Sequence, residues 1–374
     1  MIVTSMVDLA IDLSALRHNY RQLRRLCAPG VKLMAVVKAD AYGHGLLPAA
    51  RALTEEGADY FGVGSLEEGL ALRQADLNLP VLLLLGIFPE EAGPAVATSL
   101  EVTLFRLDVA QALAAAAVAQ GKKAGVHLKV DTGMGRLGLM PEEVLPFLEG
   151  LRAYPQLEVL GLTSHLAVAD LEDKSYTLRQ LEKFTGVLQA ARDRGWALPL
   201  SHIANSAALW ELKDAHFAMV RPGIMLYGSP PAPERHLPVD LQPVMSLTTR
   251  VLQVKCLPPG ESISYGRTYT TPDECDLAVL PVGYANGYSR LLSNRGQVLI
   301  RGRRAPIRGR VCMNLTMVEV SHLEDIREGE PVVLLGEDRG ERITGDELAG
   351  WAQTISYEIY LALGNANPRH YIGA

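Results

Sequence analysis

The sequence predicts an α/β protein in which a (β/α)8 TIM-type barrel is followed by a mostly β C-terminal domain. Apolar segments of strand length alternate with helical segments up to about residue 228, and eight such segments close a barrel of this kind. Polar side chains also recur directly after these segments, as they do at a barrel mouth. A doubly wound sheet is the alternative. Five or six units would suit it better than eight, and it gives no reason for polar residues at every strand end.

The predicted barrel strands are short runs rich in aliphatic and β-branched side chains. Such residues suit strands that are buried on both faces. In chain order the strands are residues 33–37, 60–64, 81–85, 101–105, 126–130, 158–163, 200–204 and 217–220.

Helix start signals lie between these strands. Ser65 and Glu68 have the spacing of a capping box, and Asp108 precedes an alanine-rich run as a predicted N-cap. Pro141 is followed by two glutamates, which is typical of a first helical turn. These signals predict helices after the second, fourth and fifth strands.

The composition changes after the predicted barrel. Residues 229–243 contain five prolines and few apolar residues, which is typical of a linker. Beyond it, strands are predicted at 244–254, 277–281, 297–301, 317–320 and 331–335, with one late helix opened by Thr344 and Glu347. We therefore predict a barrel domain at 12–235 and a β-rich domain at 236–374, with residues 1–11 as an optional addition to the second.

Composition excludes several classes of protein. The net charge of -6 and the pI near 5.9 argue against a nucleic-acid partner. No apolar run approaches the roughly 18 residues of a membrane-spanning helix, and the first twelve residues lack a signal-peptide pattern. The four cysteines form no close pair and no zinc spacing, so we expect no metal site and a cytoplasmic, reduced protein.

The residues that follow the predicted strands would converge on one mouth of the barrel. A lysine after a strand is usually a surface cap, and any one of these residues alone is more often structural. Together they provide an amine that can attack a carbonyl, two cations, an imidazole and donors suited to phosphate. Phosphate sites in barrels commonly use the last two loops. The residues are Lys38, Lys129, Asp131, Arg136, His165, Asn205, Ser206, Arg221 and Gly223.

Residues 133–138 also match the dinucleotide fingerprint G-x-G-x-x-G after a strand. A single match of this kind is a weak signal. It belongs to the fifth unit of a regular series and carries Arg136, a charge that a dinucleotide turn does not need. The sequence therefore disfavours a nicotinamide or flavin site here.

Residues 36–45, Val-Val-Lys-Ala-Asp-Ala-Tyr-Gly-His-Gly, resemble the cofactor-lysine segment of the alanine racemases, which use pyridoxal phosphate. Asn314 stands where this family usually has an aspartate, and the tail at 364–369 is only loosely similar. The resemblance covers essentially the whole chain in order. Its further segments are residues 131–138, 202–207, 220–228, 264–267, 282–285, 311–314 and 355–358.

The resemblance implies roles for the barrel residues. Lys38 would form the Schiff base with the cofactor and act as a catalytic base, and Tyr42 would bind the phosphate. Arg136 would contact the phenolic oxygen of the cofactor and the substrate carboxylate. Lys129 matches a lysine that is often carbamylated in the family, and an unmodified lysine paired with a carboxylate remains the alternative.

Arg221 would lie against the pyridine nitrogen of the cofactor. An arginine donates a hydrogen bond and leaves that nitrogen unprotonated, so the ring is a poor electron sink and transamination is suppressed. Decarboxylases of the same barrel class have a glutamate there. The resemblance implies further cofactor contacts from His165, Asn205, Ser206, Gly223, Ile224 and Tyr357.

The second domain would supply the other base. Tyr265 would reach the active site of the partner subunit, with His165 as the group that poises it, although a tyrosine in a turn is usually a surface residue and titrates near about 10. Met313 would contact the substrate carboxylate through its backbone, and Tyr284 is a further substrate contact. A homodimer with shared active sites is implied.

The resemblance implies an isomerase that interconverts L-alanine and D-alanine through a pyridoxal phosphate aldimine with two bases, supplying D-alanine for peptidoglycan. A serine or broad-specificity racemase of the same fold is the alternative. A non-catalytic cofactor-binding protein would resemble the barrel alone. The sequence leaves open the strictness for alanine, the state of Lys129, the consequence of Asn314, and turnover and regulation.

Overall fold

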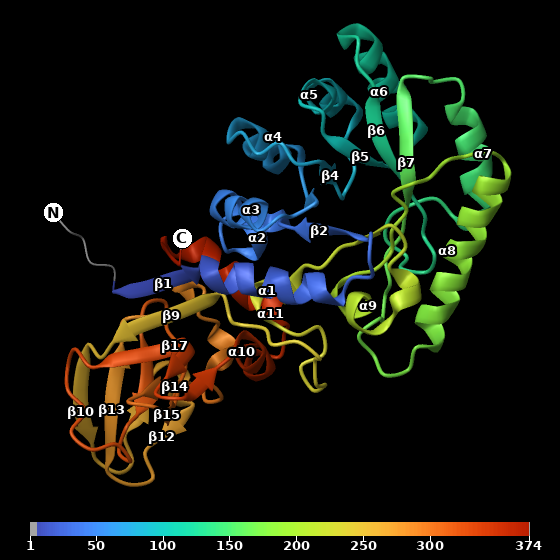
Figure 1. Cartoon of the computed structure of the whole chain (residues 1–374). Coiled ribbons are helices and arrows are strands. Elements are labelled where there is room, and N and C mark those ends of the chain that lie inside the picture. The colour runs from blue at the N-terminus through green and yellow to red at the C-terminus, as the bar shows by residue number, and fades with distance from the viewer. Residues whose placement is uncertain (1–5, 374) are drawn as a thin grey trace.

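The computed structural model describes residues 6–373 of the chain. Two lobes are visible, one of parallel strands and helices and one mostly of strands (Figure 1). The parallel sheet runs in the order β7-β6-β5-β4-β3-β2-β8. Its strands are β2 (Lys32–Val36), β3 (Tyr60–Val63), β4 (Val81–Leu83), β5 (Glu101–Leu104), β6 (Ala124–Lys129), β7 (Leu157–Thr163) and β8 (Met219–Val220).

Residues 200–204 lie between β7 and β8 and close the curled sheet. They were predicted as a strand, but only His202 forms a bridge, with Thr163. His202 N donates to Leu162 O at 2.9 Å, and Arg221 N donates to Ala204 O at 2.9 Å, so the segment bonds to both neighbours. The ladder is irregular because Leu162 N donates to the Ser201 hydroxyl rather than to a carbonyl. The barrel is confirmed, with this segment in place of a regular strand.

Helices surround the parallel strands. Two of the three helix starts that were predicted from the sequence are confirmed. Ser65 caps α4 by accepting from Glu68 N, and α7 begins at Pro141. Asp108 is not an N-cap, because α6 begins at Leu107, one residue before Asp108. The Asp108 carboxylate instead pairs with Arg106. The helices are α1 (Leu13–Leu26), α3 (Leu46–Glu55), α4 (Leu66–Gln74), α5 (Ala92–Ala97), α6 (Leu107–Gln120), α7 (Pro141–Leu151), α8 (Ser175–Asp193) and α9 (Ser206–Glu211).

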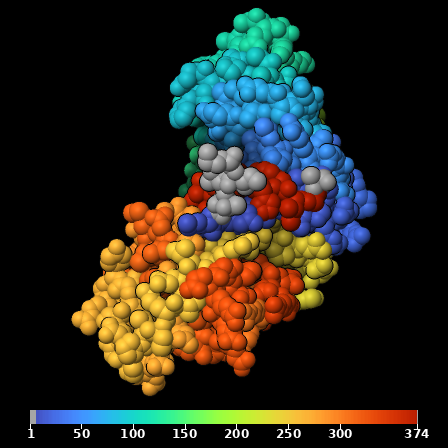
Figure 2. Space-filling model, turned by 90° about the vertical axis from the view of Figure 1, so that its left-hand side faces the viewer, coloured from blue at the N-terminus to red at the C-terminus, as the bar shows by residue number. Residues whose placement is uncertain are grey.

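The second lobe is built around a seven-stranded sheet with the order β15-β14-β17-β9-β1-β19, in which β18 also pairs with β17. Strand β1 comes from the start of the chain, and Figure 2 shows it beside the C-terminal residues at the junction of the two lobes. The strands are β1 (Val7–Asp12), β9 (Met245–Arg250), β14 (Gln297–Ile300), β15 (Arg303–Pro306), β17 (Pro331–Asp338), β18 (Glu341–Ile343) and β19 (Arg369–Ile372).

The predicted strand 244–254 is broken into two. After β9 the chain turns, because Val251 bonds through its backbone to Gly329 and Glu330, and β10 (Gln253–Leu257) joins a separate sheet with β13 (Cys275–Leu280) and β16 (Thr316–Glu319). A small hairpin pairs β11 (Ser262–Ile263) with β12 (Tyr269–Thr270). The late helix α10 (Gly345–Ala352) is capped by Thr344 as predicted, and α11 (Ser356–Ala366), which was not predicted, follows it. None of the described helices is long and apolar enough to cross a bilayer.

Candidate active site

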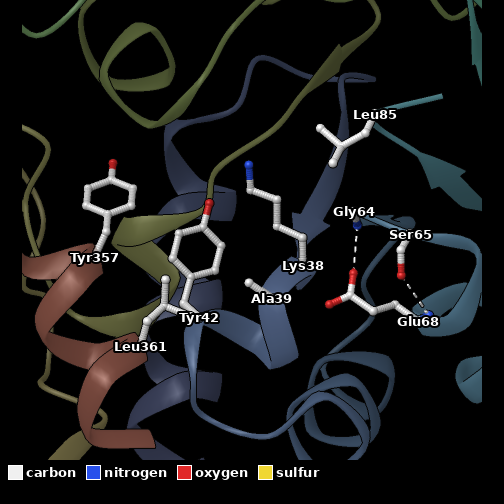
Figure 3. Close-up of a pocket in the computed structure, with 9 residues that line it drawn as sticks. All are labelled: Lys38, Ala39, Tyr42, Gly64, Ser65, Glu68, Leu85, Tyr357 and Leu361. Carbon is white, nitrogen blue, oxygen red and sulfur yellow. Dashed lines mark hydrogen bonds between the residues drawn. The ribbon is translucent and has the colours of Figure 1, made fainter. Parts of the chain in front are cut away.

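The carboxyl ends of the barrel strands open into a cavity of about 560 Å³. Eleven of its lining residues were singled out in the sequence, either as residues of the barrel mouth or, from the family resemblance, as cofactor contacts. They are Lys38, Tyr42, Lys129, Arg136, His165, Asn205, Ser206, Arg221, Gly223, Ile224 and Tyr357. A second hollow adjoins it on the side of β3 and α4 and shares Lys38, Tyr42 and Tyr357 (Figure 3).

Lys38 directly follows the buried strand β2 and Val37. Its side chain extends into the hollow between Tyr42 and Leu85 (Figure 3). Burial lowers the pKa of the Lys38 ammonium, and the charges of Arg136 and Arg221 add to this, whereas Glu68 raises it. Within residues 6–373 the ammonium forms no ion pair, so its amine can be neutral and nucleophilic more readily than an exposed lysine.

The backbone after Lys38 is left-handed, which the sequence does not suggest. Four consecutive residues from Ala39 to Tyr42 have φ between 53° and 55°, in the segment labelled α2 (Lys38–Tyr42). An L-residue in this conformation costs roughly 1–2 kcal/mol. The turn is held by side chains, since Leu46 N donates to Asp40 Oδ1 at 2.6 Å and Arg369 of β19 pairs with the same carboxylate. This turn brings the Tyr42 ring to the cavity.

Glu68 does not complete the capping box that its spacing suggests. Its Oε2 accepts from Gly64 N at 2.7 Å (Figure 3). Its Oε1 accepts from Asp40 N at 3.0 Å. The carboxylate therefore joins the loop after β3 to the left-handed turn and lies near Lys38. Sequence reasoning missed this role, because the i to i+3 spacing with Ser65 is already explained by the cap.

Replacing Glu68 with glutamine is expected to lower the free energy of unfolding by about 1–3 kcal/mol, since an amide nitrogen cannot accept one of the two N–H groups. Urea unfolding followed by circular dichroism measures this. Glu67→Gln is the matched control, because Glu67 is exposed in the same helical turn. Equal unfolding midpoints for the two variants would contradict the assignment.

The cavity contains more positive than negative charge. Lys129, Arg136 and Arg221 form no ion pair with a carboxylate in the described part of the chain. Burial and the neighbouring charges of Arg221 and Arg136 lower the pKa of Lys129 well below its usual value. Asp131 is near, but its carboxylate accepts from the backbone N–H groups of residues 133–136 at 2.8–3.1 Å. This excess of positive charge suits an anionic ligand.

Arg221 is 7% exposed and follows β8. Its Nη2 donates to Ser164 O at 2.7 Å and to Ile203 O at 3.2 Å, and its Nη1 bonds to His202 Nδ1. Burial lowers the pKa of Arg221 to about 10, so the guanidinium remains charged at neutral pH. Burial and then the charge of Arg221 hold the pKa of His165 well below its usual value, so this imidazole is neutral.

Three predicted site residues of the second lobe do not line the cavity of their own chain. Tyr265, Tyr284 and Met313 are 70%, 43% and 56% exposed. Tyr265 begins a 3-10 turn between β11 and β12, and β12 lies at the far end of the β lobe from the barrel (Figure 1). Tyr357 of α11, in contrast, reaches the cavity, where its ring lies 5.7 Å from that of Tyr42.

The fold and the cavity define a two-lobed barrel enzyme with a strand-end lysine among cationic side chains. Residues 11–231 match the family description "Alanine racemase, N-terminal domain", and residues 244–371 match "Alanine racemase, C-terminal domain". The chain belongs to the alanine racemase family.

Several known members are similar over nearly their whole length. The alanine racemase of Syntrophobacter fumaroxidans is 46% identical, with 95% of this chain and 94% of the relative covered. The alanine racemase of Symbiobacterium thermophilum is 47% identical, with 97% and 96% covered. Among solved structures, alanine racemase from Streptomyces coelicolor has a TM-score of 0.92 at 40% identity, covering 98% of each chain. The Bacillus anthracis enzyme with bound L-Ala-P has a TM-score of 0.91 at 33% identity, covering 100% of this chain and 97% of that one.

Proposed function

We propose that this isomerase interconverts L-alanine and D-alanine with pyridoxal phosphate, and that it supplies D-alanine for peptidoglycan from the cytoplasm. The observation that carries the proposal is the lysine amine at the end of β2, within a cationic cavity, in a chain that belongs to the alanine racemase family over nearly its full length. The free state of all four cysteines agrees with a reducing compartment. We also retain the division into domains at 12–235 and 236–374 as a proposal.

The residues of the cavity fit a phosphate-bearing pyridine aldehyde. A side chain at Gly223 would collide with Tyr42, since a Cβ there would lie 2.3 Å from the Tyr42 hydroxyl oxygen. Ser206 Oγ accepts from Gly223 N at 3.0 Å, which holds this loop close to the tyrosine. We propose that Tyr42, Ser206, Tyr357 and the backbone at Gly223 hold the phosphate, with Asn205 and Ile224 beside them.

Pyridoxal phosphate, when bound, withdraws electrons from the amino acid and makes its Cα proton acidic. Lys38 would hold the cofactor aldehyde and then, as a free amine, take or return the proton on one face of the substrate. Arg136 would bind the substrate carboxylate, and a carbamate on Lys129 would give Arg136 an anionic partner. Arg221 would donate to the pyridine nitrogen.

We further propose a homodimer in which each β lobe covers the partner's cavity. Within one chain Tyr265, Met313 and Tyr284 are exposed and do not line the cavity around Lys38, and a two-fold dimer can bring them to the other cavity. Exposed apolar side chains near the barrel mouth support an interface there, because large apolar groups are rarely clustered on a free surface. They include Leu85, Phe88 and Ile355. Tyr265 would then be the base on the second face, with the neutral His165 as its neighbour.

The direct test of the function is to incubate the pure protein with L-alanine and to separate D-alanine on a chiral column. Parallel incubations with L-serine and a panel of other amino acids distinguish an alanine racemase from a serine or broad-specificity racemase. No enantiomer formation from any amino acid, with bound cofactor visible in the absorption spectrum, would instead favour a non-catalytic cofactor-binding protein.

Replacing Arg221 with glutamate is expected to slow racemisation and to raise the pyruvate formed by transamination. A carboxylate can share a proton with the pyridine nitrogen, which makes the ring a stronger electron sink. Chiral chromatography and a pyruvate assay measure the two rates on the same sample. An unchanged ratio of the two products would contradict the role of Arg221.

A further inference from the structure

A chain of hydrogen-bonded polar side chains, buried except for a partly exposed glutamate at its far end, runs through the barrel behind Arg221. We call it the polar column and define it as Tyr60, Glu101, His127, His202 and Arg221. Tyr60 OH donates to Glu101 Oε1 at 2.8 Å, and His127 Nε2 lies 2.9 Å from Glu101 Oε2. His202 Nε2 lies 3.1 Å from His127 Nδ1, and His202 Nδ1 bonds to Arg221. Both histidines are completely buried.

The polar column spans the barrel from end to end. Glu101 is the first residue of β5, whereas Arg221 follows the last residue of β8. Because all the barrel strands are parallel, Glu101 lies at the amino-terminal end and Arg221 at the mouth. Residues at the bottom of a barrel usually serve stability rather than chemistry. Here a hydrogen-bonded path connects that end to the cavity.

The residues at the two ends of the polar column determine which ring nitrogen of each histidine carries the proton. An ionised carboxylate only accepts hydrogen bonds, so His127 donates through Nε2 to Glu101 and keeps a lone pair on Nδ1. A guanidinium only donates, so His202 accepts from Arg221 on Nδ1 and donates through Nε2 to His127. The same tautomer, Nε2–H, satisfies every bond, because the Thr163 hydroxyl, 3.1 Å from His202 Nδ1, can donate to that nitrogen as well. Burial and then the charge of Arg221 hold the pKa of His202 well below its usual value, which agrees with a neutral ring.

We propose that Glu101 is a positioning residue, which holds Arg221 charged and oriented through the fixed tautomers of His127 and His202. Arg221 has no carboxylate partner in the described part of the chain, and a buried charge without compensation is costly. The column extends a negative charge toward it through polarised hydrogen bonds. Nη1 and Nη2 together make the three bonds to His202, Ser164 and Ile203, which leaves Nε–H and the second Nη1 hydrogen of Arg221 for a ligand.

The effect on catalysis rests on the proposed function, in which Arg221 contacts the pyridine ring. The histidine tautomers do not depend on the proposed function, because they can be measured without any turnover of substrate. A glutamine at 101 keeps the shape of the side chain but can donate to His127. The His127 ring could then change to the Nδ1–H tautomer, and His202 would change in the same way. The Nδ1–H group of His202 would then face the N–H groups of Arg221.

The test uses ¹⁵N-labelled protein and two-bond ¹H–¹⁵N spectra of the histidine rings, assigned with His127→Gln and His202→Gln. In the parent protein both rings are expected as Nε2–H tautomers at neutral pH. Glu101→Gln is expected to add Nδ1–H signals, to move the Arg221 Nε–H resonance and to lower kcat about tenfold. Glu158→Gln is the matched control, because Glu158 is an exposed glutamate near the start of a barrel strand.

An Nδ1–H or charged ring in the parent protein would overturn the proposal, even if Glu101→Gln failed to fold. Parent-like tautomers in a folded Glu101→Gln protein would overturn the control by Glu101, whatever its activity. Reversed tautomers with unchanged kcat would overturn the link to Arg221. If the parent racemises no amino acid, the proposed function fails, and the spectra still decide whether the polar column is fixed as described.

Discussion

Replacing Lys38 with alanine is expected to lower the racemisation rate by about 10³-fold or more, since the same amine would hold the cofactor and move the proton. Chiral chromatography of reactions with each alanine enantiomer measures the loss. Borohydride reduction of the parent protein with bound pyridoxal phosphate, followed by peptide mapping, should place the adduct on Lys38.

Lys32→Ala is the matched control, because Lys32 is exposed at the start of the same strand, β2. The Lys32→Ala variant should keep parent-like activity, and peptide mapping of the parent protein should find no adduct on Lys32. A pyridoxyl group on Lys129 or Lys32 in the parent protein would contradict the assignment of Lys38. Partial recovery of Lys38→Ala by added methylamine would support the role of the amine over a role in folding.

Mixing Lys38→Ala chains with Tyr265→Phe chains is expected to restore activity, although each variant alone is inactive. In a two-fold dimer with shared sites, the mixed dimer has one doubly damaged cavity and one intact cavity. Random exchange makes half of the dimers mixed, so about a quarter of all cavities should work. Racemisation is measured after exchange, and native mass spectrometry reports the fraction of mixed dimers.

Mixing Lys38→Ala with Arg221→Glu is the matched negative control. Both residues line the cavity of their own chain, so every cavity in that mixture keeps one lesion. Recovery with Tyr265→Phe but not with Arg221→Glu would support a site shared between subunits. No recovery in either mixture, with mixed dimers present, would contradict the shared site and leave the role of Lys38 intact.

Much of the barrel could be predicted from local sequence, because a strand buried on both faces needs an unbroken apolar run. Segments such as residues 33–37 and 126–130 carry that signal by themselves. The cationic side chains at the barrel mouth could be predicted from the same strand pattern, because the residue after each parallel strand lies at one end of the barrel. The tertiary contacts that break this pattern could not be predicted from the sequence. The Ser201 hydroxyl accepts from Leu162 N of β7, which makes the segment 200–204 irregular.

The β lobe was predicted less completely. Strand β1 pairs with β9 and β19, which are more than 200 residues away along the chain, and no local pattern encodes that pairing. The strand 244–254 reads as one apolar run, but its two halves join different sheets at a turn fixed by backbone bonds to Gly329 and Glu330.

The sequence by itself determined the order of the barrel strands, the family motifs and the types of side chain at the mouth, because each depends on residues close together in the chain. The tertiary structure alone decided which partners those side chains find. Ala39 and Tyr42 carry no signal for a left-handed turn, and the turn exists because the carboxylates of Glu68 and Asp40 accept its neighbouring N–H groups. The path from Glu101 to Arg221 likewise joins β5, β6, the segment at His202 and the residue after β8, and hydrogen bonds between strands depend on the closed barrel rather than on sequence spacing.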